Sequence, residues 1–136
     1  MDEQTKKLVE IAVRNVEENC DFRFLEVNDG FARTELVVTP KHKNGMGIVY
    51  GGLLYHMADL TCGGAYLSAG GYGPTVSGDM QFINSVGEES RIICEARVVK
   101  CGRSMGFVLA DIFGENRRLF ARGTYEFFNE SRPADA

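Results

Sequence analysis

The sequence lacks the features that mark several large classes of protein. Its longest nearly apolar run, residues 45–55, is too short and too rich in glycine to span a bilayer. Its 15 basic residues against 19 acidic ones give a net charge of −4, which argues against a generally basic nucleic-acid-binding protein. It contains neither a GxGxxG motif nor a P-loop, so we expect neither nucleic acid nor a membrane as a partner.

Cysteine and histidine are too sparse and scattered for the usual metal sites. His42 and His56 are not spaced as in HExxH, and the four cysteines contain no CxxC pair. A chain of this size with 44% hydrophobic residues does not need disulfides, so we expect reduced thiols in the core and strands. The charged N-terminus, MDEQTKK, does not resemble a signal peptide. These observations favour a cytoplasmic protein without a metal site.

The residues that are present indicate one α+β domain. The 136 residues are about the length of a single domain, and no repeat, low-complexity segment or linker divides them. Apolar spacing predicts an N-terminal helix at 5–18, within the first 20 residues. A loop at 40–47 precedes a second, more apolar helix at 51–68. This helix is expected to end there because glycines and a proline follow it.

Alternating apolar residues predict six strands. They are expected at residues 22–27, 31–39, 75–83, 91–100, 104–113 and 117–128. No helix separates the last four strands, so they should be antiparallel. A long apolar helix with such a sheet predicts an α+β fold in which the sheet curls around the helix. The last residues, 129–136, are expected to fray.

Two glycines at the start of the second helix are the first chemical signal. Glycine costs about 1 kcal/mol relative to alanine inside a helix, yet Gly51 and Gly52 open this one. In a first turn, glycine lets a ligand approach unpaired N–H groups at the positive end of the helix dipole. A developing oxyanion is stabilised there. The alternative is that these glycines only permit close packing of the helix.

Asp59 is the second signal, because it lies midway along this apolar helix, where an unpaired carboxylate is costly. It shares a helix face with Gly52, His56 and Gly63. One interpretation is a partly desolvated general base or nucleophile. The alternatives are a helix edge that faces solvent and an i, i+3 pair with His56.

The segment HKNGMGIVYGG (residues 42–52) belongs to a wider pattern. A carboxylate follows eight residues after the first paired glycine, and PTVS (residues 74–77) opens a later strand. Over residues 31–127 this pattern resembles the hotdog-fold thioesterases of the phenylacetic-acid-degradation type. The resemblance implies a six-stranded antiparallel sheet wrapped around a long central helix. It also implies hydrolysis of an acyl-CoA thioester without a metal or organic cofactor, since coenzyme A is part of the substrate.

The resemblance implies roles for individual residues. Asp59 matches the carboxylate that attacks the thioester carbonyl or activates water, and Gly51 matches the glycine whose N–H points at the thioester oxygen. Asn44 matches an asparagine that positions water or the carbonyl, and Ser77 matches a serine that assists the nucleophile. Asn44 could instead only form a turn, and Ser77 could be only a strand hydroxyl. Tyr50 stands where the family has a supporting histidine, although its hydroxyl can still donate a hydrogen bond.

Helix geometry predicts a site shared by two chains. Gly51 and Asp59 are eight residues apart, which is about 12 Å along one helix. A single carbonyl must lie about 3 Å from its N–H donor and also within reach of the base. Two antiparallel copies would therefore make two composite sites, each with Asn44 and Gly51 from one chain and Asp59 and Ser77 from the other. The resemblance implies the same homodimer, commonly doubled to a tetramer.

Coenzyme A is polyanionic, so an acidic protein needs local positive charge to bind it. The expected substrate-binding residues are Gly52, Gly78, Lys100, Arg103 and Ser104, the last three in one strand-to-strand turn. The alternative is that the charged side chains of this turn are only exposed to solvent and bind no ligand.

We therefore expect an acyl-CoA thioesterase that acts on small aryl or medium-chain esters. One alternative, favoured by Tyr50, is a hotdog protein that binds acyl-CoA or a fatty ligand without catalysis. A less favoured alternative is a hotdog hydratase or dehydratase, whose carboxylate–histidine pair could come only from His56 and Asp59.

Overall fold

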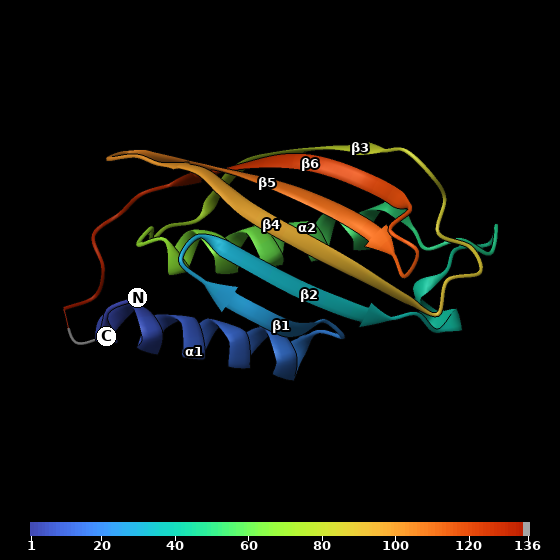
Figure 1. The fold of residues 1–136 in the computed structure, drawn as a ribbon, viewed down its shortest axis with the longest axis horizontal. Helices are drawn as coiled ribbons and strands as arrows, with labels where there is room; N and C mark the ends of the chain where they lie inside the picture. The colour runs from blue at the N-terminus through green and yellow to red at the C-terminus, as the bar shows by residue number, and fades with distance from the viewer. Residues whose placement is uncertain (135–136) are drawn as a thin grey trace.

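The computed structural model describes residues 1–134, and the elements in this part of the chain are shown in Figure 1. They are α1 (Glu3–Asn19), β1 (Arg23–Asn28), β2 (Phe31–Val37), a 3₁₀ turn (Pro40–His42), α2 (Gly51–Ser68), β3 (Thr75–Phe82), β4 (Arg91–Cys101), β5 (Met105–Gly114) and β6 (Leu119–Phe128). The predicted elements are all present with ends that differ by at most two residues, and α2 has the predicted bounds. The 3₁₀ turn lies inside the predicted loop. No helix among the described residues is long and apolar enough to cross a membrane.

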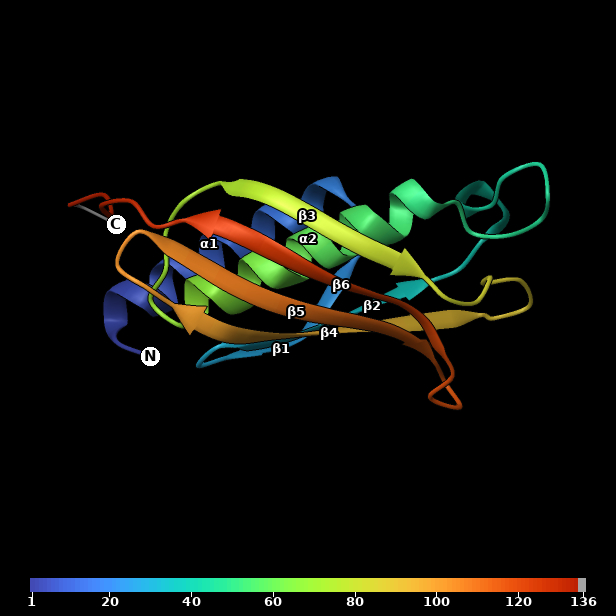
Figure 2. The same cartoon turned by 90° about the horizontal axis from the view of Figure 1, so that it is seen from above.

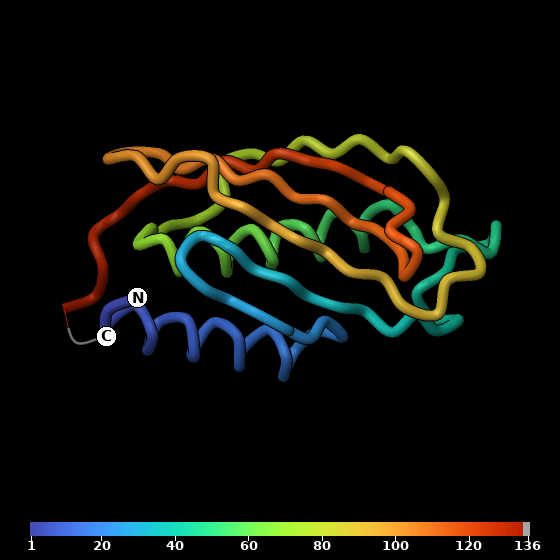
Figure 3. The backbone as a smooth tube through the Cα atoms, in the orientation of Figure 1, coloured from blue at the N-terminus to red at the C-terminus, as the bar shows by residue number. Residues whose placement is uncertain are grey.

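The six strands form one antiparallel sheet in the order β1-β2-β4-β5-β6-β3. The sheet curves over α2, and α1 lies beside α2 and β1 (Figures 1 and 2). The backbone trace in Figure 3 shows the strands crossing α2 on one side only. The predicted α+β fold, a curled sheet around a central helix, is confirmed. Its consequence for the site is that the opposite side of α2 remains uncovered by the sheet.

The core lies between α2 and the sheet. Met57, Ala58 and Cys62 of α2 are fully buried there. Thr61 donates its hydroxyl to the carbonyl of Met57 at 2.7 Å and lies 2.7 Å from the hydroxyl of Thr34 on β2, which satisfies both buried hydroxyls. Gly64 allows β1 to approach closely, because a Cβ at this position would lie 2.8 Å from the ring of Phe24.

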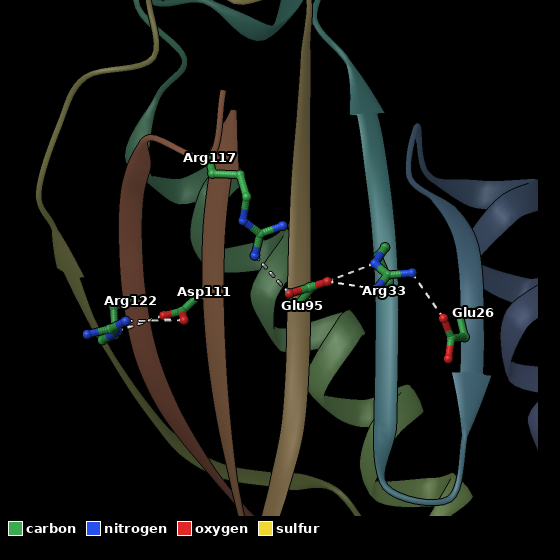
Figure 4. A network of polar contacts seen from close by, with 6 residues as sticks. All are labelled: Glu26, Arg33, Glu95, Asp111, Arg117 and Arg122. Atoms are coloured by element: carbon green, nitrogen blue, oxygen red, sulfur yellow. Dashed lines mark hydrogen bonds and ion pairs between the residues drawn. The ribbon is translucent and has the colours of Figure 1, made fainter. Parts of the chain in front are cut away.

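The outer face of the sheet carries rows of ion pairs (Figure 4). Arg33 bridges Glu26 and Glu95, with N–O distances of 3.0 and 2.8 Å. Arg122 binds Asp111 with two hydrogen bonds of 2.7 and 3.2 Å. Exposed ion pairs of this kind contribute about 1 kcal/mol or less each. Their main consequence is that these guanidinium groups are engaged by neighbouring carboxylates on the face of the sheet away from α2.

The C-terminal segment, which was expected to fray, makes contacts as far as residue 133. The amide of Asn129 donates to the carbonyl of Gly102 at 2.7 Å, and Arg132 donates to Thr5 of α1 at 2.8 Å. The side chain of Gln4 donates to the carbonyl of Pro133 at 3.1 Å. The prediction of a frayed end used local composition, whereas these hydrogen bonds join distant parts of the chain. The rest of the predicted tail, residues 135–136, lies outside the described residues.

Candidate active site

The partner of Asp59 is Thr75, the first residue of β3. The Oγ1 of Thr75 donates to the Oδ1 of Asp59 at 2.7 Å, and Asp59 is half-buried. Within residues 1–134 this is the only hydrogen bond of the carboxylate, so its second oxygen can accept a proton from a ligand or water. Sequence reasoning missed Thr75. Its place at the start of a strand gave no sign that this strand begins beside the middle of α2.

His56 does not pair with Asp59. Its ring packs edge-on against Phe22, with 5.3 Å between the ring centroids. The alternative of an i, i+3 pair is therefore wrong. The carboxylate–histidine pair required for a hydratase or dehydratase is also not formed, which removes the observation that favoured that alternative.

The start of α2 has no side-chain cap. Tyr50 occupies the N-cap position, and no side chain in the described part of the protein bonds to the N–H groups of the first turn. The N–H of Leu53 donates to the carbonyl of Tyr50 at 3.1 Å, so the N–H groups of Gly51 and Gly52 are the ones available to an anion at the positive end of the helix dipole. A Cβ on Gly51 would lie 3.2 Å from the ring of Phe82, so glycine also permits β3 to pack closely here. Both interpretations of the paired glycines are thus compatible with the structure.

Asn44 forms a turn in the loop before α2. Its Oδ1 accepts a hydrogen bond from the N–H of Met46 at 2.9 Å, and its own N–H donates to the carbonyl of Ile48 at 2.8 Å. Gly47 completes the turn with a φ of 78°, a conformation that favours glycine. The alternative role of Asn44 as a turn residue is therefore observed, and any contact with substrate would be additional.

His42 anchors this loop to the junction of α1 and β1. Its ring is buried, with Nδ1 accepting the N–H of Thr39 at 3.0 Å. The proton must then be on Nε2, which donates to the Oδ2 of Asp21 at 2.8 Å. The hydrogen bonds from His42 and Lys41 lower the pKa of Asp21 below its usual value. Residues 43–50 are therefore held at one end by a polar contact with a distant segment.

The predicted residues of β3 differ in their surroundings. Ser77 is exposed, and no hydrogen bond of its hydroxyl is found in the described part of the chain. Gly78 lies under two aromatic side chains: a Cβ there would be 2.4 Å from the hydroxyl oxygen of Tyr55 and 2.6 Å from the ring of Tyr125. Gly78 is therefore required for packing. Burial raises the pKa of Tyr125, whose hydroxyl donates to the carbonyl of Tyr55 at 2.9 Å.

Within one chain, α2 separates the two halves of the predicted site. The helix is continuous from Gly51 to Ser68, so the open N–H groups and Asp59 are about 12 Å apart along its axis. One chain cannot bring both to a single carbonyl. Among the described residues, no group of three or more His, Cys, Asp or Glu side chains could hold a metal ion.

Comparison with known proteins identifies the family. The model of the Thioesterase superfamily matches residues 46–121, which is more than half of the chain and includes the start of α2, Asp59 and Thr75. The chain belongs to the thioesterase superfamily. The resemblance inferred from the sequence is therefore confirmed, and the protein is a thioester hydrolase.

Individual relatives agree with this assignment. The thioesterase is 28% identical over 118 residues to a protein of Archaeoglobus fulgidus named "Putative esterase", covering 85% of this chain and 77% of the relative. Zebrafish thioesterase superfamily member 2 has a TM-score of 0.82 at 21% identity, with 93% of this chain and 98% of that chain covered. The PaaI protein from the phenylacetic acid degradation operon of E. coli has a TM-score of 0.81 at 19% identity, with 90% and 94% covered. These structures share the hotdog fold.

Basic residues of the thioesterase lie at the end of the sheet where β3 begins. Lys100, Arg103 and Ser104 are exposed in and beside the β4–β5 turn, which lies at the same end as the start of β3 (Figure 2). Asn129 holds this turn through its bond to Gly102. The predicted charges are thus brought to the end of the molecule nearest Thr75.

The uncovered side of the thioesterase has apolar side chains along α2 and β3. The exposed members in or next to these two elements are Tyr50, Tyr55, Val76, Phe82 and Ile83, and Met46 is exposed in the loop before α2. Strand β3 is an edge strand, paired only with β6 in the described chain. Unpaired backbone groups next to exposed apolar side chains are typical of an interface with another chain.

Proposed function

We propose that this thioesterase hydrolyses small aryl or medium-chain acyl-CoA esters with Asp59 as general base or nucleophile. The observation that carries the proposal is the half-buried carboxylate, held through Oδ1 by Thr75, midway along an otherwise apolar helix. Fixing one oxygen orients the other for proton abstraction or attack. In support, solved relatives from Streptococcus pneumoniae and Streptococcus mutans contain coenzyme A and acetyl-CoA respectively.

Two chemical routes are open to this carboxylate. As a base, Asp59 takes a proton from water while the water oxygen bonds to the thioester carbon. The C–S bond then breaks, and the departing CoA thiolate takes the proton from Asp59. As a nucleophile, its oxygen bonds to that carbon and displaces the CoA thiolate, and water then cleaves the resulting anhydride. Both routes give the free acid and CoA thiol, and Asp59 ends ionised. The thiolate is a good leaving group, so neither route requires a strong general acid.

A homodimer would complete the site. Pairing of two β3 edges would bring the uncovered sides of two α2 helices together and bury the apolar side chains along them. In an antiparallel arrangement, the first-turn N–H of Gly51 from one chain would approach Asp59 of the other. Tyr50, 43% exposed at the N-cap, and Asn44 would accompany Gly51. Ser77 was predicted to accompany Asp59, but it pairs with Glu126 on the face of the sheet opposite to the buried Tyr125 and Phe127, so Thr75 takes that place in the proposed site. Each dimer would then have two composite sites.

The turn that contains Arg103 is proposed to bind the phosphates of coenzyme A. Lys100 and Ser104 lie beside it, and all three are exposed at the end of the sheet nearest Thr75. Arg122 is a poor candidate for the same role because Asp111 already binds its guanidinium. The surface position of Gly52 would let a ligand approach the helix backbone closely.

Release of thiol from a panel of CoA esters tests this function. The panel contains acetyl-, octanoyl-, benzoyl-, phenylacetyl- and palmitoyl-CoA, and a thiol-reactive dye follows the product. We expect kcat/KM to be highest for the octanoyl and aryl esters. Tight binding of these esters without release of CoA would contradict the proposal and favour the alternative of a binding protein.

Replacing Thr75 should slow hydrolysis without unfolding the protein. Thr75→Val removes the hydrogen bond to Asp59 but keeps the shape of the side chain. A hydrogen bond to a charged group contributes about 1.5–3 kcal/mol, so kcat should fall about 10- to 100-fold. Thr75→Ser, which keeps the hydroxyl, is the matched control and should recover most of the rate. Equal rates for the Val and Ser variants would show that the hydroxyl does not position the carboxylate.

A further inference from the structure

A cavity of about 300 Å³ lies between α1 and α2 and reaches the candidate catalytic pair. Asp59 and Thr75 form part of its lining. Most of the remaining wall is apolar, with Ala12 from α1 and Leu60 and Leu67 from α2 among its residues. An apolar cavity with a few polar groups at one place is typical of a site that binds an apolar ligand in one orientation.

Two larger hollows in the described structure fit an acyl group less well. One, of about 380 Å³, is lined in part by Tyr72 and Glu130 and includes neither Asp59 nor Thr75. A larger one, of about 610 Å³, lies between α1 and β1, but its lining includes Glu10, Arg14, Glu17 and Glu26 and does not include Asp59. Burying an acyl chain against these charged groups would be unfavourable. Volume alone would select this hollow, whereas proximity to the catalytic pair and the chemistry of the walls select the smaller one.

Gly63 faces this cavity, and no packing contact within residues 1–134 explains why it is glycine. A Cβ at Gly63 would have no heavy atom outside its local helix backbone within 4 Å, whereas a Cβ at the adjacent Gly64 would meet Phe24 at 2.8 Å. Glycine inside a helix costs about 1 kcal/mol relative to alanine. Gly63 is also one turn beyond Asp59 on the same face of α2. Its missing side chain therefore leaves space directly beside the carboxylate.

The size of the cavity limits the acyl group. From Asp59 to Leu67 it follows α2 for eight residues, or about 12 Å. A cavity of about 150 Å³ is large enough for benzene, so about 300 Å³ holds an aryl ring with a short linker or an unbranched chain of about eight carbons. A palmitoyl chain is too long for it.

We propose that this cavity binds the acyl group of the thioester, with Gly63 keeping open the space next to Asp59. The inference rests on the proposed function, because it takes Asp59 to act on the thioester carbonyl. The acyl chain then extends from the carbonyl along α2, under α1, and the residues at positions 63 and 12 set the size of the group that is hydrolysed.

Two variants that fill the cavity from opposite walls test the proposal. Gly63→Leu fills it from α2 and Ala12→Phe fills it from α1. Ile11→Phe is the matched control, since Ile11 is 61% exposed on α1 and is not part of the lining. The readout is the ratio of kcat/KM for octanoyl-CoA to that for acetyl-CoA. We expect the ratio to fall at least tenfold in both filling variants and to remain within twofold of wild type in the control.

The possible outcomes separate this inference from the proposed function. If the filling variants release thiol with an unchanged ratio, the acyl group binds elsewhere and the inference is overturned, while the proposed function stands. The inference is also overturned if Gly63→Leu disrupts the oligomer and Ala12→Phe leaves the ratio unchanged, because Gly63 then faces a second copy of the chain. If either filling variant does not fold, the other decides. If the wild-type protein hydrolyses no CoA ester, the proposed function and this inference fail together.

Discussion

Asp59→Asn is expected to lower kcat for hydrolysis of CoA esters by about 10²- to 10⁴-fold, the range usually supplied by a general base. The amide can still accept the hydrogen bond from Thr75 at Oδ1, but it can neither take a proton from water nor attack the carbonyl. The fold should be unaffected, because the substitution preserves shape and removes a charge from an apolar helix. The measurement is kcat from thiol release, with the melting temperature and molecular mass in solution as controls for folding and assembly.

Asp79→Asn is the matched control for this substitution. Asp79 is the exposed carboxylate of β3, and it has no place in the proposed site. Its loss should change kcat by less than about twofold, as expected of a surface substitution. A rate close to wild type for Asp59→Asn would refute its assignment as base or nucleophile. If Asp79→Asn lowered kcat strongly at the same time, the role of base or nucleophile would be assigned to Asp79 on β3.

Mixed dimers are expected to recover activity that neither parent variant has. The first parent is Asp59→Asn. The second is Gly51→Pro, which removes the N–H from the first helical position while retaining a backbone that proline tolerates there. Tyr50, which precedes it, is extended at φ −71° and ψ 146°, a conformation compatible with a following proline. Loss of one oxyanion donor should lower kcat about 10²- to 10³-fold.

Random mixing of equal amounts of the two inactive parents makes half of the dimers mixed. In each mixed dimer, one composite site carries both substitutions and the other carries neither. The mixture should therefore recover about one quarter of wild-type activity. Gly51→Ala, which keeps the N–H, separates loss of the donor from added bulk against Phe82. Absence of recovery, with mixed dimers shown to form, would mean that one chain supplies the whole site.

The sequence predicted well those features that depend on residues close together in the chain. It predicted poorly those that depend on contacts between distant segments. Residues 51–68 were predicted as a helix because apolar coverage and flanking glycines and proline are properties of one segment. The alternation of Ile92, Cys94 and Ala96 similarly predicted which face of β4 is buried. Asp59 was found because a charge in an apolar helix is unusual in any fold. Asn44, in contrast, had two compatible interpretations, and only the structure showed its turn.

The residues that were missed depend on contacts between elements. Thr75 meets Asp59 because the connection after α2 returns the chain to the middle of that helix, and no local pattern encodes this return. The same is true of Arg132, which docks on α1 although its segment has the composition of a frayed tail. Gly63 and Gly64 are adjacent glycines that the sequence does not distinguish, yet Gly64 packs against Phe24 and Gly63 faces a cavity.

The sequence by itself therefore determined the elements, the fold class, the family and the unusual carboxylate, since each is encoded by local periodicity, composition or a short motif. Only the tertiary structure decided which hydroxyl orients that carboxylate, which glycine faces a cavity and which strand is left at the edge of the sheet. The physical reason is that helix and strand formation depends mainly on neighbours in the chain. Packing and hydrogen bonds between elements depend on residues that meet only after folding.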